Sequence, residues 1–213
     1  MRGRKPSGVR THHVRIRVED VEELVQRRDV IGYKNIHSVI HALLKQSDKP
    51  PTIEEVMKET TPVVIVGLPN HGKTHFIRNK LIPALSNKHD RVSVLVIDRG
   101  NEYDSLENVG KSVHAIDWKK PNQRLRIVPS DDPEVAKTEV DLTIRNLVTH
   151  AYAGNMKNWI LIIEECQLYQ DLGSLRDFVY RSRRFLRKLI LVTPKLDAFP
   201  GLQTFRIHWE KSD

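Results

Sequence analysis

One short stretch constrains this chain more than any other. Residues 67–74 read Gly-Leu-Pro-Asn-His-Gly-Lys-Thr, which fits the pattern G-x-x-x-x-G-K-[ST] of a phosphate-binding loop. The block just before it, residues 63–66, is short and rich in valine and predicts a buried parallel strand, and residues 74–86 can form a helix. A strand, a glycine-bounded turn and a helix together bring backbone N–H groups and a helix N-terminus to one point, where an anion binds.

This loop predicts a nucleotide site. Lys73 is expected to reach the β- and γ-phosphates, and Thr74 is expected to ligate Mg²⁺. The residues expected to contact the nucleotide are the loop and the residue after it: Gly67, Leu68, Pro69, Asn70, His71, Gly72, Lys73, Thr74 and His75.

Composition narrows the class of protein. With 213 residues, the chain has room for one α/β domain and a small appendage. The single cysteine, Cys166, excludes an internal disulfide framework and a cysteine-rich zinc site, and a reducing cytoplasm is the simplest location. We find no run of 18 apolar residues that predicts a membrane span, and the basic N-terminus lacks the apolar segment of a secretory signal. The net charge of +8 favours a polyanionic partner.

The N-terminal segment has a strict two-residue alternation. Over residues 13–18, apolar side chains lie on one face, and His13, Arg15 and Arg17 lie on the other. Two amphipathic helical patterns follow, separated by Gly32. This segment is too small to bury a core, and its lone strand has an unpaired edge. Two copies would remove both problems by pairing their strands into an antiparallel ribbon, which fits the major groove of B-DNA.

Residues 9–46 resemble the ribbon-helix-helix family of DNA-binding domains. The resemblance rests on His-Val-Arg-Ile-Arg-Val-Glu-Asp at 13–20, the turn at 32–35 and the second amphipathic helix. It implies that His13, Arg15 and Arg17 face the bases. The alternative is a dimerisation module with a solvated basic strand. The predicted organisation is then a basic arm (1–8), this segment (9–46), a linker with a short helix opened by the capping box Thr52-x-x-Glu55 (47–60), and a phosphate-loop domain (61–213).

The phosphate-loop domain predicts an α/β fold with a mostly parallel sheet flanked by helices. Further strands are expected at 91–97, around 112–116, at 159–163, at 189–193 and, at the sheet edge, at 203–209; a helix is expected at 133–151 with Val135 inward. Segments 118–120 and 124–126 are interpreted as flanking a loop that lines a DNA channel.

The strand at 159–163 ends in two acids, Glu164 and Glu165. Ligands bind at the carboxyl ends of parallel strands, so we expect these acids to meet the phosphate-binding loop. We assign Glu164 to the metal and Glu165 to catalysis, as the group that orients and deprotonates the attacking water. An exchange of these two roles remains open, and the alternative is a strand end with solvated acids.

Residues 61–213 resemble the HerA–FtsK branch of P-loop ATPases, which have a RecA-like core with an additional catalytic glutamate. The similar segments are Asp98-Arg-Gly-Asn-Glu102-Tyr103, Ile163-Glu164-Glu165-Cys166-Gln167, Arg181-Ser-Arg-Arg-Phe and Leu189-Ile-Leu-Val-Thr193-Pro194. Two positions depart from the family: Glu164 stands where Asp is usual, and Thr193 stands where a Gln sensor is common.

The resemblance implies ATP as the nucleotide and an oligomeric ring that moves or packages double-stranded DNA. Arg183 would be an arginine finger acting on a neighbouring subunit, with Arg184 as the alternative, and Asp98, Glu102 and Thr193 are further site candidates. Paired N-terminal segments and a ring are compatible in a hexamer of three pairs. The small size favours an archaeal virus or mobile element, with the host cytoplasm as location.

Two other functions remain open. One is an ATP-controlled DNA-binding regulator or partition factor of a virus or plasmid, although position 68 is Leu, where a partition ATPase would carry an additional lysine. The other is a nucleotide or small-molecule kinase, which would leave residues 9–46 unexplained.

Overall fold

The computed structural model describes residues 52–58, 62–67, 69–70, 72–85, 91–110, 113–195 and the backbone of 205–208. The chain divides into two units, Met1–Leu43 and Leu44–Asp213, and every described residue lies in the second. The expected DNA contacts His13, Arg15 and Arg17 therefore lie outside the described residues, as do Leu68 and His71 of the phosphate-binding loop.

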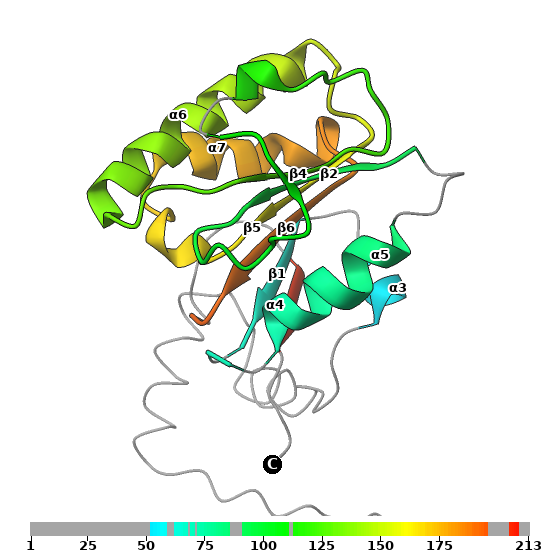
Figure 1. Ribbon diagram of the computed structural model, residues 1–213, viewed down its shortest axis with the longest axis vertical. Helices are drawn as coiled ribbons and strands as arrows, with labels where there is room; N and C mark the ends of the chain where they lie inside the picture. Colours follow the sequence, from blue (N-terminus) through cyan, green and yellow to red (C-terminus); the bar gives the residue numbers. More distant parts are fainter. Residues whose placement is uncertain are drawn as a thin grey trace, which may run out of the picture. The chain divides into compact units, whose positions relative to one another are not determined.

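Within the described residues, seven strands form one sheet whose paired strands all run parallel (Figure 1). The strand order is β3-β4-β2-β5-β6-β1-β7. The strands are β1 (Val63–Val66), β2 (Ser93–Ile97), β3 (Glu107–Asn108), β4 (Arg124–Ile127), β5 (Trp159–Ile163), β6 (Lys188–Thr193) and β7 (Phe205–His208). The expected strands at both ends of this domain are confirmed, with β7 at the edge beside β1.

Helices cover both faces of the sheet, which confirms the expected α/β class (Figure 1). On one face lie α6 (Pro133–Tyr152) and α7 (Gly173–Arg181); on the other lie α3 (Ile53–Lys58) and the helical run α4 (Lys73–Phe76), a π-helical turn (Ile77–Leu81) and α5 (Ile82–Ala84). Alternate strand residues enter the two cores: Val64 packs with the α6 side, and Val63 and Ile65 pack with the α4 side. Burial on both faces explains why the central strands are continuous apolar runs.

Capping side chains fix where two helices begin. The Thr52 N–H donates to Oε2 of Glu55 (2.7 Å), and the Glu55 N–H donates to Oγ1 of Thr52 (3.1 Å), so the expected capping box is confirmed. At α6, Oδ1 of Asp132 accepts the N–H groups of Glu134 and Val135, and Pro133 occupies the first turn.

The expected strand around 112–116 is wrong. Residues Val113–Ala115 form a 3₁₀ helix, and the strand beside β2 is β4. Val113 and Ile116 are both buried three residues apart, which suits a helical turn rather than a strand. In β4, the sequence Arg-Leu-Arg-Ile alternates with the two-residue period of a strand. The strand was missed because its two arginines make the segment unlike a buried apolar strand.

The arginines of β4, expected beside a DNA channel, bind groups of the protein, and the channel itself stays a prediction. The Arg124 guanidinium donates to the carbonyls of Val92 (2.6 Å) and Leu85 (2.9 Å), and Arg126 pairs with Asp98. Both side chains bind the protein itself and tie β4 to its surroundings.

Val135 of α6, expected to face inward, is 46% exposed. Among the described residues, no helix combines the length and apolar character that crossing a membrane requires.

Candidate active site

The phosphate-binding segment has the local geometry of a strand, a turn and a helix. After β1, the Gly67 N–H donates to the carbonyl of Thr193 (3.2 Å) at the end of β6. Gly72 has φ 85°, a left-handed conformation that favours glycine, and α4 begins at Lys73 without a side-chain cap. Nζ of Lys73 donates to the carbonyl of Gly67 (2.7 Å), so the ammonium lies across the loop.

Strand order brings this loop to the acidic pair. Strand β6 lies between β1 and β5, and all three strands are parallel, so their carboxyl ends share one edge of the sheet. A cavity of about 220 Å³ opens there, and Lys73, Thr74, Glu164 and Glu165 all line it. Its other lining residues are Pro69, Asn70, Asp98, Gly100, Glu102, Tyr103, Val192, Thr193 and Pro194.

Glu164 is a buried carboxyl group with a defined partner. Its side chain is 7% exposed, and the Tyr103 hydroxyl donates to its Oε1. Burial raises the pKa of Glu164 to about 7; the Tyr103 hydrogen bond opposes that rise, nearby Glu102 adds to it, and Lys73 opposes it. Burial also lowers the pKa of Lys73, against the attraction of Glu164, Glu102 and Glu165.

Glu165 is in a different environment although it is the next residue. It is exposed, and its backbone is left-handed (φ 48°, ψ 38°) at the start of the 3₁₀ helix Cys166–Leu168. A non-glycine residue in this conformation costs roughly 1–3 kcal/mol and is maintained by the surrounding structure. The two neighbouring acids therefore have opposite surroundings. Glu164 is buried and hydrogen-bonded, whereas Glu165 is exposed to solvent.

The turn after β2 is organised by Asp98, which is 1% exposed. Oδ1 of Asp98 accepts the Glu102 N–H (2.9 Å), and Oδ2 accepts the Tyr103 N–H (2.9 Å). The same Oδ2 pairs with Nη1 of Arg126 (3.1 Å). Both oxygens of Asp98 are therefore committed to the protein, and Asp98 supports the turn while Glu102 and Tyr103 project from it.

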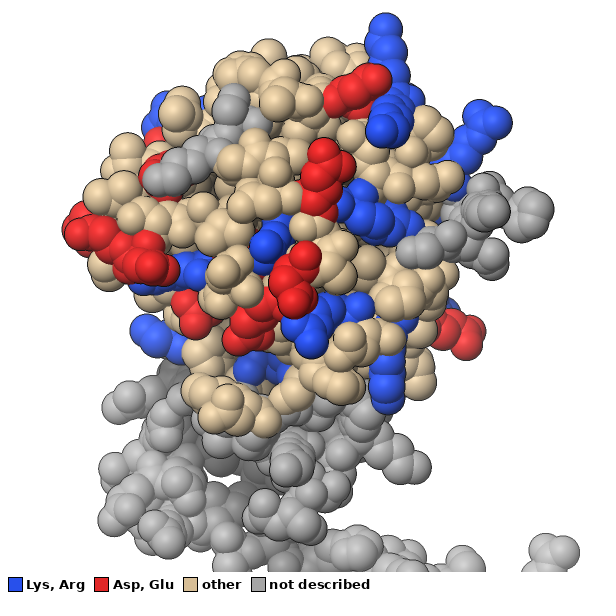
Figure 2. Space-filling model, viewed as in Figure 1, with Lys and Arg blue, Asp and Glu red and all other residues tan. Residues whose placement is uncertain are grey.

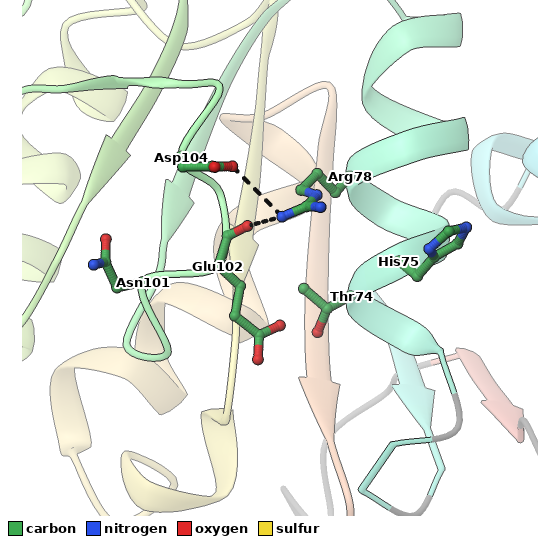
Figure 3. A pocket seen from close by; sticks show the side chains of 6 residues that line it. All are labelled: Thr74, His75, Arg78, Asn101, Glu102 and Asp104. Carbon is green, nitrogen blue, oxygen red and sulfur yellow. Dashed lines mark hydrogen bonds and ion pairs between the residues drawn. The ribbon is translucent and has the colours of Figure 1, made fainter.

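Glu102 also borders a second cavity, of about 250 Å³, which shares Thr74 with the first (Figure 3). Nη1 of Arg78 donates to the carbonyl of Glu102 (2.6 Å) and pairs with Asp104 (3.5 Å). In Figure 3 the Glu102 carboxylate lies beside Thr74, whereas the His75 ring lies on the other side of the helix. The His75 imidazole contacts Asn79 (3.1 Å) and does not line the first cavity.

The donor set suits Mg²⁺. This ion is usually held by one or two carboxylates together with water and substrate phosphates. Thr74 offers a hydroxyl and Glu164 a carboxylate in the cavity that Lys73 also lines. Over the described part of the chain, no group of three His, Cys, Asp or Glu side chains is arranged to hold a metal by itself. An ion at this position would therefore be held jointly by the protein and the phosphates.

The remaining predicted residues divide into two groups. Thr193, buried at the end of β6, lines the cavity, and its Oγ1 accepts the Lys195 N–H (3.0 Å). Arg183 and Arg184 are exposed on the 3₁₀ helix Ser182–Arg184 and line neither cavity. The sequence analysis gave no role in the site to Tyr103 or Arg78, and it placed Arg126 beside a DNA channel rather than in the site. Only Tyr103 stood in a quoted motif, and the contacts of the other two depend on the tertiary structure.

No family model and no curated protein matches the chain. Among solved structures it is similar to the genome packaging NTPase B204 from Sulfolobus turreted icosahedral virus 2. The complex with AMPPCP is 21% identical, with 68% of this chain and 69% of that chain covered and a TM-score of 0.42. The complex with ATP-γS is 22% identical, with 68% of each chain covered and a TM-score of 0.42. These values are low, so the fold assignment rests on the strand order and the loop geometry.

Proposed function

We propose that this chain is an Mg²⁺-dependent ATPase. The observation that carries the proposal is that Lys73, Thr74, Glu164 and Glu165 line the same cavity at the carboxyl edge of the sheet. A lysine and an uncapped helix start on one side suit phosphate groups, and two carboxylates on the other side suit a metal and a water molecule.

Each residue has a part in this mechanism that its environment supports. The Lys73 ammonium would neutralise phosphate charge, and the Thr74 hydroxyl and Glu164 would hold the metal, which when bound would supply further positive charge to the phosphates. Glu165 is exposed to solvent and has its own backbone conformation, so its carboxylate is free of the Tyr103 contact and can orient and deprotonate the attacking water. Exchange of the roles of Glu164 and Glu165 would leave the buried acid as the base.

We further infer that the ATPase drives the packaging or translocation of double-stranded DNA as a ring of identical subunits. The support is the order of the HerA–FtsK-like segments and the ribbon-helix-helix pattern at 9–46. Figure 2 shows basic and acidic side chains interspersed on the visible face of the described residues, without a broad surface of one sign. On the pattern at 9–46 we assign DNA recognition to His13, Arg15 and Arg17, and we assign the finger in a neighbouring subunit to Arg183 or Arg184.

The test is ATP turnover with Mg²⁺, measured with and without duplex DNA. Strong stimulation by DNA is expected for the motor. DNA binding without turnover would favour the regulator or partition factor, and turnover indifferent to DNA would favour a kinase. Glu165→Gln is expected to bind ATP and to lose turnover, whereas the control Glu134→Gln, an exposed acid on α6, is expected to behave as wild type. Full turnover in Glu165→Gln would move the catalytic role to Glu164.

The proposed DNA contacts of the segment 9–46 are tested separately, by measuring duplex binding. Arg15→Ala is expected to weaken duplex binding by about 1–3 kcal/mol if Arg15 contacts a guanine. Its ATP turnover without DNA is expected to be unchanged. Unaltered affinity for DNA over a range of salt concentrations would contradict the ribbon model and leave the ATPase proposal standing.

A further inference from the structure

Tyr103 joins two segments that are far apart in the chain. It follows the turn after β2, its side chain is fully buried, and its hydroxyl donates to Oε1 of Glu164, 61 residues further on. The ring packs in the core on the α4 side of the sheet, together with Phe76 and Ile77 of the helix that follows the phosphate-binding loop. The phenol therefore reaches the acid from within the core.

The position of Tyr103 is set independently of Glu164. Its backbone N–H is bound by Oδ2 of Asp98 (2.9 Å). Arg126 of β4 holds that turn from one side, through Asp98 (3.1 Å) and Oδ1 of Asn101 (2.7 Å). Arg78, on the helix after the phosphate-binding loop, holds it from another side through the Glu102 carbonyl. A hydroxyl carried by a turn with several anchors is well placed to fix a partner.

Glu164 has two ways to satisfy its carboxylate. A carboxylate has two oxygens with about four acceptor positions, and Tyr103 occupies one oxygen. Lys73 lines the same cavity as Glu164, and the charges of the two side chains attract each other. If Glu164 turned to bind Lys73 directly, the ammonium would be drawn from the phosphates and the carboxylate from the metal.

We propose that Tyr103 is a positioning residue for Glu164. Its hydroxyl holds Oε1 in the core, so that the other oxygen of Glu164 faces the cavity beside Thr74 and remains available to the hydration shell of Mg²⁺. The turn braced by Asp98, Arg126 and Arg78 supplies the rigidity. This inference rests on the proposed ATPase function and adds to it a residue that acts through Glu164.

The experiment is a Mg²⁺ titration of Tyr103→Phe, which removes the hydroxyl and keeps the ring. Two quantities are followed: ATP turnover and the binding of a fluorescent ATP analogue. Partners that orient a metal ligand typically contribute 10–100-fold to metal affinity or activity, so the half-saturating Mg²⁺ concentration is expected to rise by about tenfold. Analogue binding in EDTA and the melting temperature are expected to change little.

Tyr169→Phe is the matched control. Tyr169 is also fully buried and follows β5, so this variant removes a hydroxyl from the same region and leaves the Tyr103–Glu164 contact in place. Its Mg²⁺ dependence is expected to match wild type. Glu164→Gln serves as the positive reference, with a weakened response to Mg²⁺.

Three results would overturn the inference. One is an unchanged Mg²⁺ dependence in Tyr103→Phe while Glu164→Gln is altered. Another is an equal rise of the half-saturating Mg²⁺ concentration in Tyr169→Phe. The third is that Tyr103→Phe loses analogue binding in EDTA and also melts at a lower temperature, which would indicate a general loss of structure. The proposed function fails separately, when wild type with saturating Mg²⁺ hydrolyses no ATP. In that case the role of Tyr103 is still tested by whether Tyr103→Phe changes the Mg²⁺ dependence of analogue binding. If analogue binding to wild type does not depend on Mg²⁺ at all, both the proposed function and the role of Tyr103 are wrong.

Discussion

Two consecutive glutamates at the end of β5 differ in burial, in hydrogen bonding and in backbone conformation. Glu164 is buried and bound by Tyr103, and Glu165 is exposed on a left-handed backbone. A buried carboxyl group prefers its neutral form, because the core solvates charge poorly. The pKa of Glu164, raised to about 7, makes the stability of the protein depend on pH.

Glu164→Gln tests that dependence. Because the pKa of Glu164 is raised in the folded state, its contribution to stability is complete below about pH 4.5 and is lost as the pH rises towards about 7. Glutamine accepts the same hydrogen bond but never ionises. Without nucleotide or Mg²⁺, the variant is expected to melt with wild type near pH 4.5 and about 5 °C higher at pH 8.

Thermal melts from pH 4.5 to 8 check this prediction. Glu134→Gln, which removes an exposed carboxylate from α6, is the control and is expected to show no such divergence. A difference between Glu164→Gln and wild type that is constant over the whole pH range would contradict a raised pKa at Glu164.

Helices and strands show which local signals were strong enough to identify an element. Strands β1, β2, β5 and β6 are fully buried and mostly apolar, and these were expected from the sequence. Strand β4 was missed because two of its four residues are arginines, whose charges are satisfied by carbonyls and by Asp98. Helix α6 was expected, and Asp132 determines where it begins.

Asp132→Ala tests the contribution of that cap. Loss of an N-cap typically costs about 1 kcal/mol, because the N–H groups of Glu134 and Val135 lose their acceptor. For a protein of this size, the melting temperature is expected to fall by about 2–4 °C.

The neighbouring Asp131→Ala is the control for the cap. Arg99 binds the backbone carbonyl of Asp131 (3.0 Å), which the substitution keeps. Thermal or urea unfolding of both variants decides the question, and equal losses of stability would show that Asp132 acts through charge and not through its cap.

At the scale of the whole molecule, the exposed arginines Arg183 and Arg184 lie apart from the candidate active site. Arg183 and Arg184 line neither cavity, so within one copy they do not reach the place where Lys73 and the two glutamates meet. A finger supplied by a neighbouring subunit requires an exposed arginine of this kind, and such a finger can raise turnover by about 10³–10⁵-fold. An assembly of identical copies would join the two surfaces.

Mixing two inactive variants tests this assembly. Arg183→Ala keeps its own Glu165, and Glu165→Gln keeps its own Arg183, so an oligomer containing both is expected to regain turnover at their shared interfaces. Each variant alone is expected to be inactive. Recovery is read as ATP hydrolysis after mixing, and Arg187→Ala, another exposed arginine of the same segment, is the control that should remain active.

The outcome of the mixing experiment also distinguishes the two arginines. If Arg183→Ala remains active and Arg184→Ala shows the loss and the recovery, the finger is Arg184. If neither variant loses turnover, the proposed finger in a neighbouring subunit is wrong, and the ATPase function itself is unaffected by that result.

The sequence by itself determined the features that depend on neighbours in the chain. These are the phosphate-binding loop with its strand and helix, the acidic pair at the end of β5, the capping box at Thr52 and the α/β class. Such features follow from turn chemistry, capping and the period of apolar residues, all of which act over a few positions.

Only the tertiary structure decided which distant groups meet. It placed β6 between β1 and β5, chose β4 as the strand beside β2, and brought Tyr103 to Glu164 and Arg126 to Asp98. A periodic pattern specifies which face of a strand is buried, but it does not specify strand order or the partner of a buried polar group. Those depend on long-range packing, in which a buried charge or hydroxyl must find an acceptor or donor wherever the fold brings one.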